Sequence, residues 1–319
     1  MWKKKNIDKA INYFKEALKL EPNNKTALRS LSMIIRNKEN QDSQEKLNIA
    51  EESIGYAKKA ISLDLQDSFS WYIMGNAYFY KAFVDKNQYK DLLYALNAYN
   101  RSEGKIKKYK NPDLFYNRAV VHSYLENYEM AYLDFKEASI IDENLKSDNL
   151  CENILNTVKT TNKLIKNMCG LKPTKLAQIL TNIPHQLRED VNFKLITCQD
   201  LIEGENKEKI LTGKIVTNVE SSFDVPISFV CVDYSGNFYN LSIYNISKEF
   251  LSTIVYMTSS VVIFNPIMKK IKMDIKDEEK EKKIEYPCVQ ISDLNNLLVD
   301  GKYCSGFKSS ATLSSTFFN

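Results

Sequence analysis

The first half of the chain repeats one pattern of small and apolar positions. In four stretches, a small residue is followed four positions later by a bulky or small residue and three positions after that by another small one. The four triplets are Ala10, Phe14, Ala17; Ser53, Ala57, Ala60; Ala95, Tyr99, Ser102; and Ala131, Phe135, Ala138. This spacing places each triplet on one helix face, where small residues let a neighbouring helix approach closely. The pattern predicts closely packed helices whose repeats start 43, 42 and 36 residues apart.

A second kind of helix precedes three of these stretches. Its sequences are TALRSLSMIIRN, SWYIMGNAYF and LFYNRAVVHSY, the last two with an aromatic, a small residue and an aromatic or His at helical spacing. They resemble helix A of a tetratricopeptide repeat, a unit of two helices. Extra polar residues fall at 37–46 and 84–90, between helices A and B. The alternative is a generic amphipathic bundle; the phased repeats favour an α-solenoid with a concave groove.

The resemblance to these repeats implies which residues line the groove. Helix A of each repeat presents a stripe of side chains to a bound peptide. The amide side chain of Asn117, next to Tyr116 in the fourth repeat, also faces the ligand in such repeats. The predicted peptide-binding residues are Arg29, Arg36, Tyr72, Asn76, Phe79, Asp113, Tyr116 and Asn117.

The chemistry of this stripe suits a short extended peptide. Asn amides can bond a peptide backbone and aromatic rings supply apolar walls, while Arg36 and Asp113 offer one charge of each sign. The alternative is that both charges are solvated or cap helices, since Asp113 follows Asn111-Pro112, a normal start of a helix. The sequence alone leaves both interpretations open.

From about Val191 the hydrophobic pattern alternates with a period of two. Five or six stretches rich in β-branched and aromatic residues are separated by turn residues, and a short helix is expected at 247–253. They resemble an OB-fold, a five-stranded Greek-key barrel. The predicted fold class is therefore α then β, a tetratricopeptide-repeat α-solenoid followed by an OB-like five-stranded β-barrel. The predicted parts are repeats with a capping helix at 1–169, a linker at 170–190, the OB-like domain at 191–303 and a disordered tail at 304–319.

OB-folds often bind single-stranded nucleic acid through basic and aromatic side chains. The candidates for such contacts are Lys214, Phe238, Tyr239, Tyr244 and Lys269. The nearby run at 276–285 mixes both signs of charge, which is typical of a solvated loop or hairpin tip. Protein contact or structural closure is the favoured role of the barrel, and nucleic-acid binding stays the alternative.

Composition narrows the class of protein further. The 319 residues contain only 9 Gly and 7 Pro, which favours long helices, and the net charge of +4 demands no nucleic-acid partner. No run of 18 apolar residues and no signal-peptide core is present, so we expect no membrane span and an intracellular protein. Six scattered Cys without a C-x-x-C pair and two His indicate neither a zinc site nor a disulfide framework. No catalytic motif occurs, so we expect a non-enzyme without cofactors.

Several segments together resemble one family, the Strap proteins, which join tetratricopeptide repeats to a C-terminal OB domain. The resemblance rests on LRSLSMIIR (28–36), ISLDLQDSFSWYIMGNAYF (61–79), NPDLFYNRAVVHSY (111–124) and DVPISFVCVDYSGNFYNLSIYNI (224–246). The chain opens with MWKKKNIDKA, which resembles the middle of a repeat, so the family's upstream repeats are expected to be absent. Either a shortened homologue or an incomplete gene model would explain this start.

The resemblance implies a non-catalytic adaptor and two roles. One is recognition of the nascent N-terminal peptide of tubulin at the ribosome, which triggers decay of tubulin mRNA. The groove must then read a Met-Arg-Glu start, and the family's groove arginine and its acidic residue match Arg36 and Asp113. The alternative role is a nuclear stress or DNA-damage transcriptional cofactor whose OB domain contacts chromatin or nucleic acid. Expected partners are therefore proteins or peptides, with ribosome contact under the first role and nucleic acid under the second.

Overall fold

A computed structural model describes residues 2–38, 42–84, 88–103, 111–183, 193–277 and 280–309 of the chain. By its internal contacts the chain divides into two compact units. The first comprises Met1–Leu125 and Leu133–Asp148, and the second comprises Glu126–Tyr132 and Asn149–Asn319.

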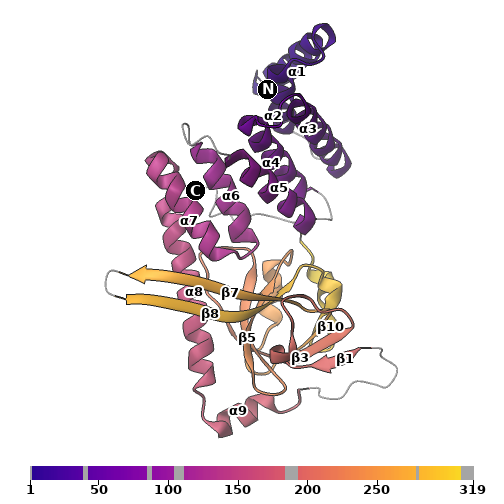
Figure 1. Cartoon of the computed structure of the whole chain (residues 1–319). Coiled ribbons are helices and arrows are strands. Elements are labelled where there is room, and N and C mark those ends of the chain that lie inside the picture. The colour runs from indigo at the N-terminus through magenta and orange to yellow at the C-terminus, as the bar shows by residue number, and fades with distance from the viewer. Residues whose placement is uncertain are drawn as a thin grey trace. The chain divides into compact units, whose positions relative to one another are not determined.

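The first unit is built from helices, as the repeat pattern predicts (Figure 1). Within the described residues they are α1 (Trp2–Leu20), α2 (Lys25–Ile34), the 3-10 helix η1 (Ile35–Asn37), α3 (Ser43–Leu63), α4 (Ser68–Ala82), α5 (Gln88–Glu103), α6 (Pro112–Tyr124), most of α7 (Tyr128–Ile141) and the 3-10 helix η2 (Glu143–Leu145). Consecutive helices from α1 to α6 contact one another, and α4 also contacts α2 and α6. The helices that resemble helix A therefore lie next to each other along the array.

Local sequence explains where these helices begin. The side chains of Asn24, Asp42 and Asn111 each accept a hydrogen bond from a backbone N–H in the first turn of the helix that follows. Pro112 occupies the first turn of α6, where its missing N–H has no partner to lose. The caps satisfy amides that would otherwise be unpaired at each helix start.

The small-residue triplets lie in the core, as their spacing predicts. Every member of the three later triplets is buried. The three residues of the first triplet, on α1, are half-buried. Gly75 shows why a small residue is needed at the seam. A Cβ atom at this position would lie 2.4 Å from the ring of Tyr99, which is fully buried. The α4–α5 pair can therefore approach this closely only with glycine there.

The second unit contains a ten-stranded sheet. Its strands are β1 (Lys194–Ile196), β2 (Gly204–Glu205), β3 (Lys209–Asn218), β4 (Ile227–Asp233), β5 (Phe238–Ile243), β6 (Ser260–Phe264), β7 (Ile267–Asp277), β8 (Lys280–Ile291), β9 (Leu297–Val299) and β10 (Lys302–Tyr303). The hydrogen-bonded order is β10-β9-β6-β3-β4-β5-β8-β7-β2, with β1 parallel to β3 and β5 parallel to β8. The sequence predicts five or six strands, and the structure adds the short strands β2, β9 and β10, whose two or three residues carry no clear alternating pattern.

Two features of this unit differ in detail from the sequence prediction. The stretch 259–275 is two strands, because Asn265 has a left-handed backbone and Pro266 follows it, which turns the chain between β6 and β7. The start of the predicted disordered tail is ordered: residues Cys304–Phe307 form the 3-10 helix η6. Cys304 is buried, Phe307 packs on the core of the sheet and Lys308 bridges to Ile246. Residues 310–319 of the predicted tail lie outside the described residues.

Helix α8 (Ser147–Cys169), predicted to cap the repeats, belongs to the second unit from Asn149 onward. Its Thr157 hydroxyl lies 3.0 Å from the hydroxyl of Ser221, so its polar contacts include the loop between β3 and β4. The predicted linker contains the helix α9 (Pro173–Leu180), and residues 184–190 lie outside the described residues. Among the helices that the structure describes, none is both long enough and apolar enough to cross a bilayer.

Candidate peptide-binding face

Arg36 lies in η1, at the end of α2, with its side chain half-buried. Its Nε donates a hydrogen bond to the carbonyl oxygen of Ser32 at 3.0 Å. Burial lowers the pKa of the guanidinium, and the nearby hydroxyls of Tyr99, Tyr72 and Tyr80 act in the opposite direction. Among the described residues, no carboxylate pairs with Arg36. A desolvated cation surrounded by phenols is suited to take a carboxylate from a ligand.

Tyr72 connects this cation to the predicted acidic residue. Burial raises the pKa of its hydroxyl; the charge of Asp113 raises it further, whereas that of Arg36 lowers it. The charges of Arg36 on η1 and Asp113 on α6 therefore act in opposite directions on the pKa of one hydroxyl of α4. This is the arrangement that a peptide with one acidic and one basic side chain requires.

Asp113 is exposed, near the start of α6. Its backbone N–H donates to the side chain of Asn111 at 3.1 Å, so Asn111 is the residue that caps the helix. Within the described chain, the Asp113 carboxylate makes no ion pair. The capping role that the sequence left open belongs to Asn111, and the carboxylate of Asp113 is available to a ligand.

The two predicted amides are joined to each other. The Nδ2 of Asn117 donates to Oδ1 of Asn76 at 3.0 Å, and the hydroxyl of Tyr99 donates to the same oxygen at 2.7 Å. Both Asn side chains are half-buried. Tyr99 thus supports the site from α5, although the sequence placed it only in a packing triplet. Its hydroxyl, where the other triplets have Ala or Phe at the middle position, is the signal that could have revealed this role.

Of the three predicted aromatic walls, Phe79 and Tyr116 are half-buried, whereas Tyr72 is buried. Tyr116 meets the ring of Phe135 edge-on, with ring centroids 5.4 Å apart, and burial raises the pKa of Tyr116. Phe79 meets Phe83 in the same way at 5.5 Å. Each ring therefore has one packed side and one accessible part, which is how an apolar wall of a binding face is built.

Arg29 differs from Arg36, because its charge is already compensated. Its Nη1 lies 3.1 Å from the carboxylate of Asp67, and its guanidinium lies over the ring of Phe69, 5.2 Å from the centroid. The partner stands 38 residues further along the chain. The structure therefore assigns Arg29 a packing contact that the repeat stripe does not reveal, and its predicted role toward a peptide finds no support in this geometry.

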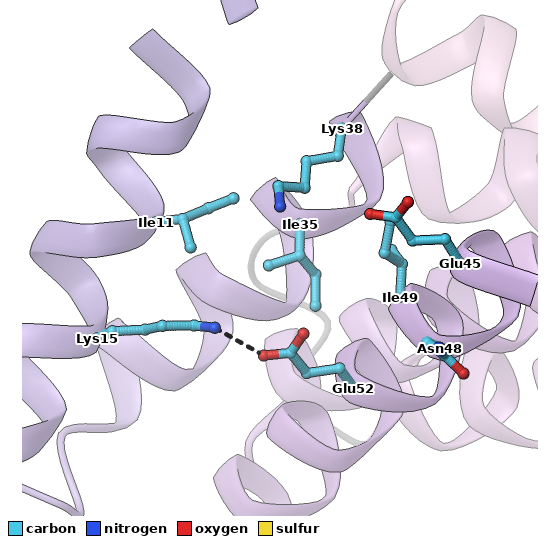
Figure 2. Close-up of a pocket in the computed structure, with 8 residues that line it drawn as sticks. All are labelled: Ile11, Lys15, Ile35, Lys38, Glu45, Asn48, Ile49 and Glu52. Carbon is cyan, nitrogen blue, oxygen red and sulfur yellow. Dashed lines mark ion pairs between the residues drawn. The ribbon is translucent and has the colours of Figure 1, made fainter. Parts of the chain in front are cut away.

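A separate small cavity lies among α1, η1 and α3 (Figure 2). Its volume is about 160 Å³, and Lys15 and Glu52 form an ion pair of 3.1 Å at its side. It is lined by Ile11, Lys15, Ile35, Lys38, Glu45, Asn48, Ile49 and Glu52. Ligand sites usually exceed about 300 Å³. The cavity contains none of the predicted peptide-binding residues, and we interpret it as a packing gap.

The five candidates for nucleic-acid contact do not form an exposed surface on which bases could stack. Phe238, Tyr239 and Tyr244 are all buried, so no base can stack on them. Lys214 is buried and donates to the carbonyl oxygen of Thr181 at 2.6 Å. Lys269 is half-buried and burial lowers its pKa. The geometry therefore lends no support to the predicted nucleic-acid contact, because β5 is buried along its whole length and its aromatics lie in the interior of the unit.

The comparisons with known proteins agree with the two-part architecture. Residues 192–312 match the family model described as the tetratricopeptide repeat protein 5 OB fold domain. Tetratricopeptide repeat protein 5 of Mus musculus is 29% identical over 98% of this chain and 73% of its own length. The Homo sapiens protein of the same name is 29% identical over 94% of this chain and 70% of its own length.

Two solved structures show partial similarity to this chain. A thermophilic TPR protein of Thermus thermophilus has a TM-score of 0.38 and 18% identity, covering 46% of this chain and 72% of that one. YrrB, described as a TPR protein with an unusual peptide-binding site, has a TM-score of 0.35 and 17% identity, covering 49% of this chain and 71% of that one.

The chain therefore has a helical region that resembles tetratricopeptide repeats, followed by a β-sheet region that matches an OB-fold domain. Its relatives over nearly the whole chain are the proteins named tetratricopeptide repeat protein 5. The predicted resemblance to a family that joins such repeats to an OB domain is confirmed. The relationship supports a protein-binding adaptor, and the comparisons indicate no enzyme family.

Proposed function

We propose that the face formed by Arg36, Tyr72, Asn76, Asp113 and Asn117 binds a short extended peptide that carries an acidic and a basic side chain. The ligand is the nascent N-terminus of tubulin at the ribosome, which begins with Met-Arg-Glu under the Strap resemblance. Arg36 takes the peptide glutamate, Asp113 takes the peptide arginine, and the Asn pair bonds the backbone between them. The chain would then act as a non-catalytic adaptor in tubulin mRNA autoregulation.

The observation that carries the proposal is the state of Arg36. Its guanidinium is desolvated beside three tyrosines, and the described part of the chain supplies it with no carboxylate. A cation in such surroundings gains a strong, charge-assisted bond when a ligand brings a carboxylate. Asp113 is the complement, since its carboxylate is exposed and unpaired among the described residues. Two opposite charges acting on the same Tyr72 hydroxyl match the consecutive basic and acidic residues of the peptide.

The test is a titration of the full chain with a fluorescent peptide starting Met-Arg-Glu. Binding is expected, and Arg36→Ala and Asp113→Ala should each weaken it by about 1.5–3 kcal/mol, the range of one charge-assisted bond. Arg101→Ala and Glu16→Ala are matched controls, because each removes a like charge from an exposed helix position outside this face. No binding, or equal losses in the variants and their controls, would refute the proposal.

The second function expected from the resemblance, a nuclear cofactor acting through nucleic acid, gains no support from the OB-fold domain. The side chains that would make the contact are buried or bonded within the chain. The tubulin proposal implies a cytoplasmic, ribosome-associated pool. We propose that fractionation of cells translating tubulin will find the chain with ribosomes, and its absence from them would argue against this role.

A further inference from the structure

Glu126 is a carboxylate buried inside the second compact unit. It is only 2% exposed, and its backbone has a positive φ of 56°, a conformation that residues other than glycine rarely adopt. The residue follows α6 and precedes α7, yet it belongs to the unit that contains the sheet. A buried carboxylate in an unfavourable backbone conformation persists only where its surroundings compensate for both.

Strands β5 and β8, with the residue after β5, supply that compensation. The hydroxyl of Ser242 donates to Oε1 of Glu126 at 2.7 Å, the hydroxyl of Tyr244 to Oε2 at 3.0 Å, and Nε2 of Gln290 to Oε2 at 2.5 Å. The thiol of Cys288 lies between them, 3.6 Å from Oε2. Both oxygens are therefore bonded, and the donors come from two strands that pair in parallel. This is a complete site for a carboxylate.

The next residues of the same segment attach to β7. Nζ of Lys269 donates to Oδ1 of Asn127 at 2.5 Å, and the backbone N–H of Asp274 donates to the carboxylate of Glu129 at 3.2 Å. On this side of β7 the strand β2 pairs only with Ile267 and Met268. Glu129 therefore satisfies an amide at the open edge of a strand, which would otherwise be free to pair with another chain.

We propose that the donors on β5 and β8 form a carboxylate-binding site whose ligand is the chain's own Glu126, and that this bond locks residues 126–132 onto the OB-fold domain. The proposal also explains which partners engage Tyr244 and Lys269, two residues predicted to contact nucleic acid. Their polar atoms are engaged by Glu126 and Asn127, so the chain itself occupies the positions that the sequence offered to nucleic acid. The OB-fold domain of this protein consequently includes a segment that lies before α8 in the sequence.

Hydrogen–deuterium exchange on the full chain, resolved by peptide mass spectrometry, tests the lock. Tyr244→Phe removes one donor and keeps the ring, and Glu126→Gln keeps the shape but removes the charge. Both should speed exchange at least about 10-fold in peptides that cover 126–132, with a smaller rise in β5 and β8, because local opening is governed by the local contacts. Peptides from α2 to α4 should exchange as in the wild type.

Two controls separate the lock from a general loss of stability. Tyr303→Phe removes a hydroxyl from an exposed tyrosine of the same unit, and Glu129→Gln keeps the oxygen that the Asp274 amide needs. Both should leave exchange at 126–132 within about twofold of the wild type, since neither touches the buried site. Exchange at 126–132 that is unchanged in Tyr244→Phe, or that rises no more there than in α2 to α4, would overturn the proposal.

Discussion

Asn117 and Asn76 share a hydrogen bond of 3.0 Å that links α6 to α4, and the accepting oxygen of Asn76 also receives the Tyr99 hydroxyl from α5. Three helices therefore meet at one amide oxygen. The bond fixes the orientation of Asn117, whose own oxygen has no partner among the described residues. An amide held in this way is ready to accept from the backbone of a peptide, at little cost in ordering.

Replacing Asn76 should destabilise the fold, because the Tyr99 hydroxyl donates to its side-chain oxygen. Asn76→Ala leaves the buried hydroxyl of Tyr99 without its acceptor, so we expect a loss of about 1–3 kcal/mol in the free energy of unfolding. In Asn76→Ala with Tyr99→Phe, part of that loss should be recovered, because the buried hydroxyl donor is gone, while the half-buried Nδ2 of Asn117 loses its acceptor in both variants. Urea titration of the single and double variants measures both terms. A double variant that is no more stable than Asn76→Ala would contradict the assigned bond.

The two helical glycines should respond to alanine in opposite directions. In Gly75→Ala the new methyl group overlaps the Tyr99 ring, so we expect a loss of about 1–3 kcal/mol from forced repacking. Gly55 lies within α3 with no atom within 4 Å of its Cβ position, so Gly55→Ala should gain about 0.5–1 kcal/mol from helix propensity. Thermal unfolding of both variants decides this. Equal effects would show that the seam is not as tight as described.

Arg118 should tolerate the loss of one acidic partner and not of the other. Its guanidinium meets the buried carboxylate of Asp134 with two bonds of 2.7 Å and that of Glu103, which is half exposed, with one of 2.6 Å. Asp134→Ala removes both bonds to the buried partner and leaves the buried guanidinium with only the half-exposed Glu103 carboxylate, so it should cost up to about 3–5 kcal/mol. Glu103→Ala removes a solvent-screened pair and should cost at most about 1 kcal/mol. Chemical denaturation measures both, and a Glu103→Ala loss as large as that of Asp134→Ala would be inconsistent with their burial.

One of the six thiols should react in the folded protein. Cys169 is exposed at the end of α8, whereas the other five are buried. Burial raises the pKa of Cys198 to about 12 and of Cys304 to about 11, so these thiols hold little of the reactive thiolate near pH 8. A thiol-reactive dye should therefore label one site rapidly, and Cys169→Ser should abolish that phase. Rapid labelling of a second site would contradict the described burial.

The repeat array was predictable because its spacing is a direct consequence of packing. The triplets of small residues mark the seams, and residues such as Ala57 and Ala60 are fully buried as expected. The order of helical and strand parts followed from the change in hydrophobic period alone. The short strands of the sheet were missed, since two or three residues carry too little pattern to be recognised.

The individual side chains were less predictable, because their partners lie far along the chain. Nothing near Arg29 in the sequence shows that Asp67 will neutralise it, while Arg36, seven residues later, has no such partner in the described residues. The same limit applies to Tyr244 and Lys269. Their residue types suit nucleic acid, and only the fold shows that Glu126 and Asn127, more than a hundred residues earlier, take their polar atoms.

The most direct test of the central claim is a double-mutant cycle between this face and the peptide. Arg36→Ala is combined with a peptide in which Glu is replaced by Ala, and Asp113→Ala with a peptide in which Arg is replaced by Ala, using binding titrations throughout. Each matched pair should show a coupling energy of about 1–3 kcal/mol, and each crossed pair should be additive within about 0.5 kcal/mol. Additive losses in the matched pairs would contradict the assignment of the peptide glutamate to Arg36 and the peptide arginine to Asp113.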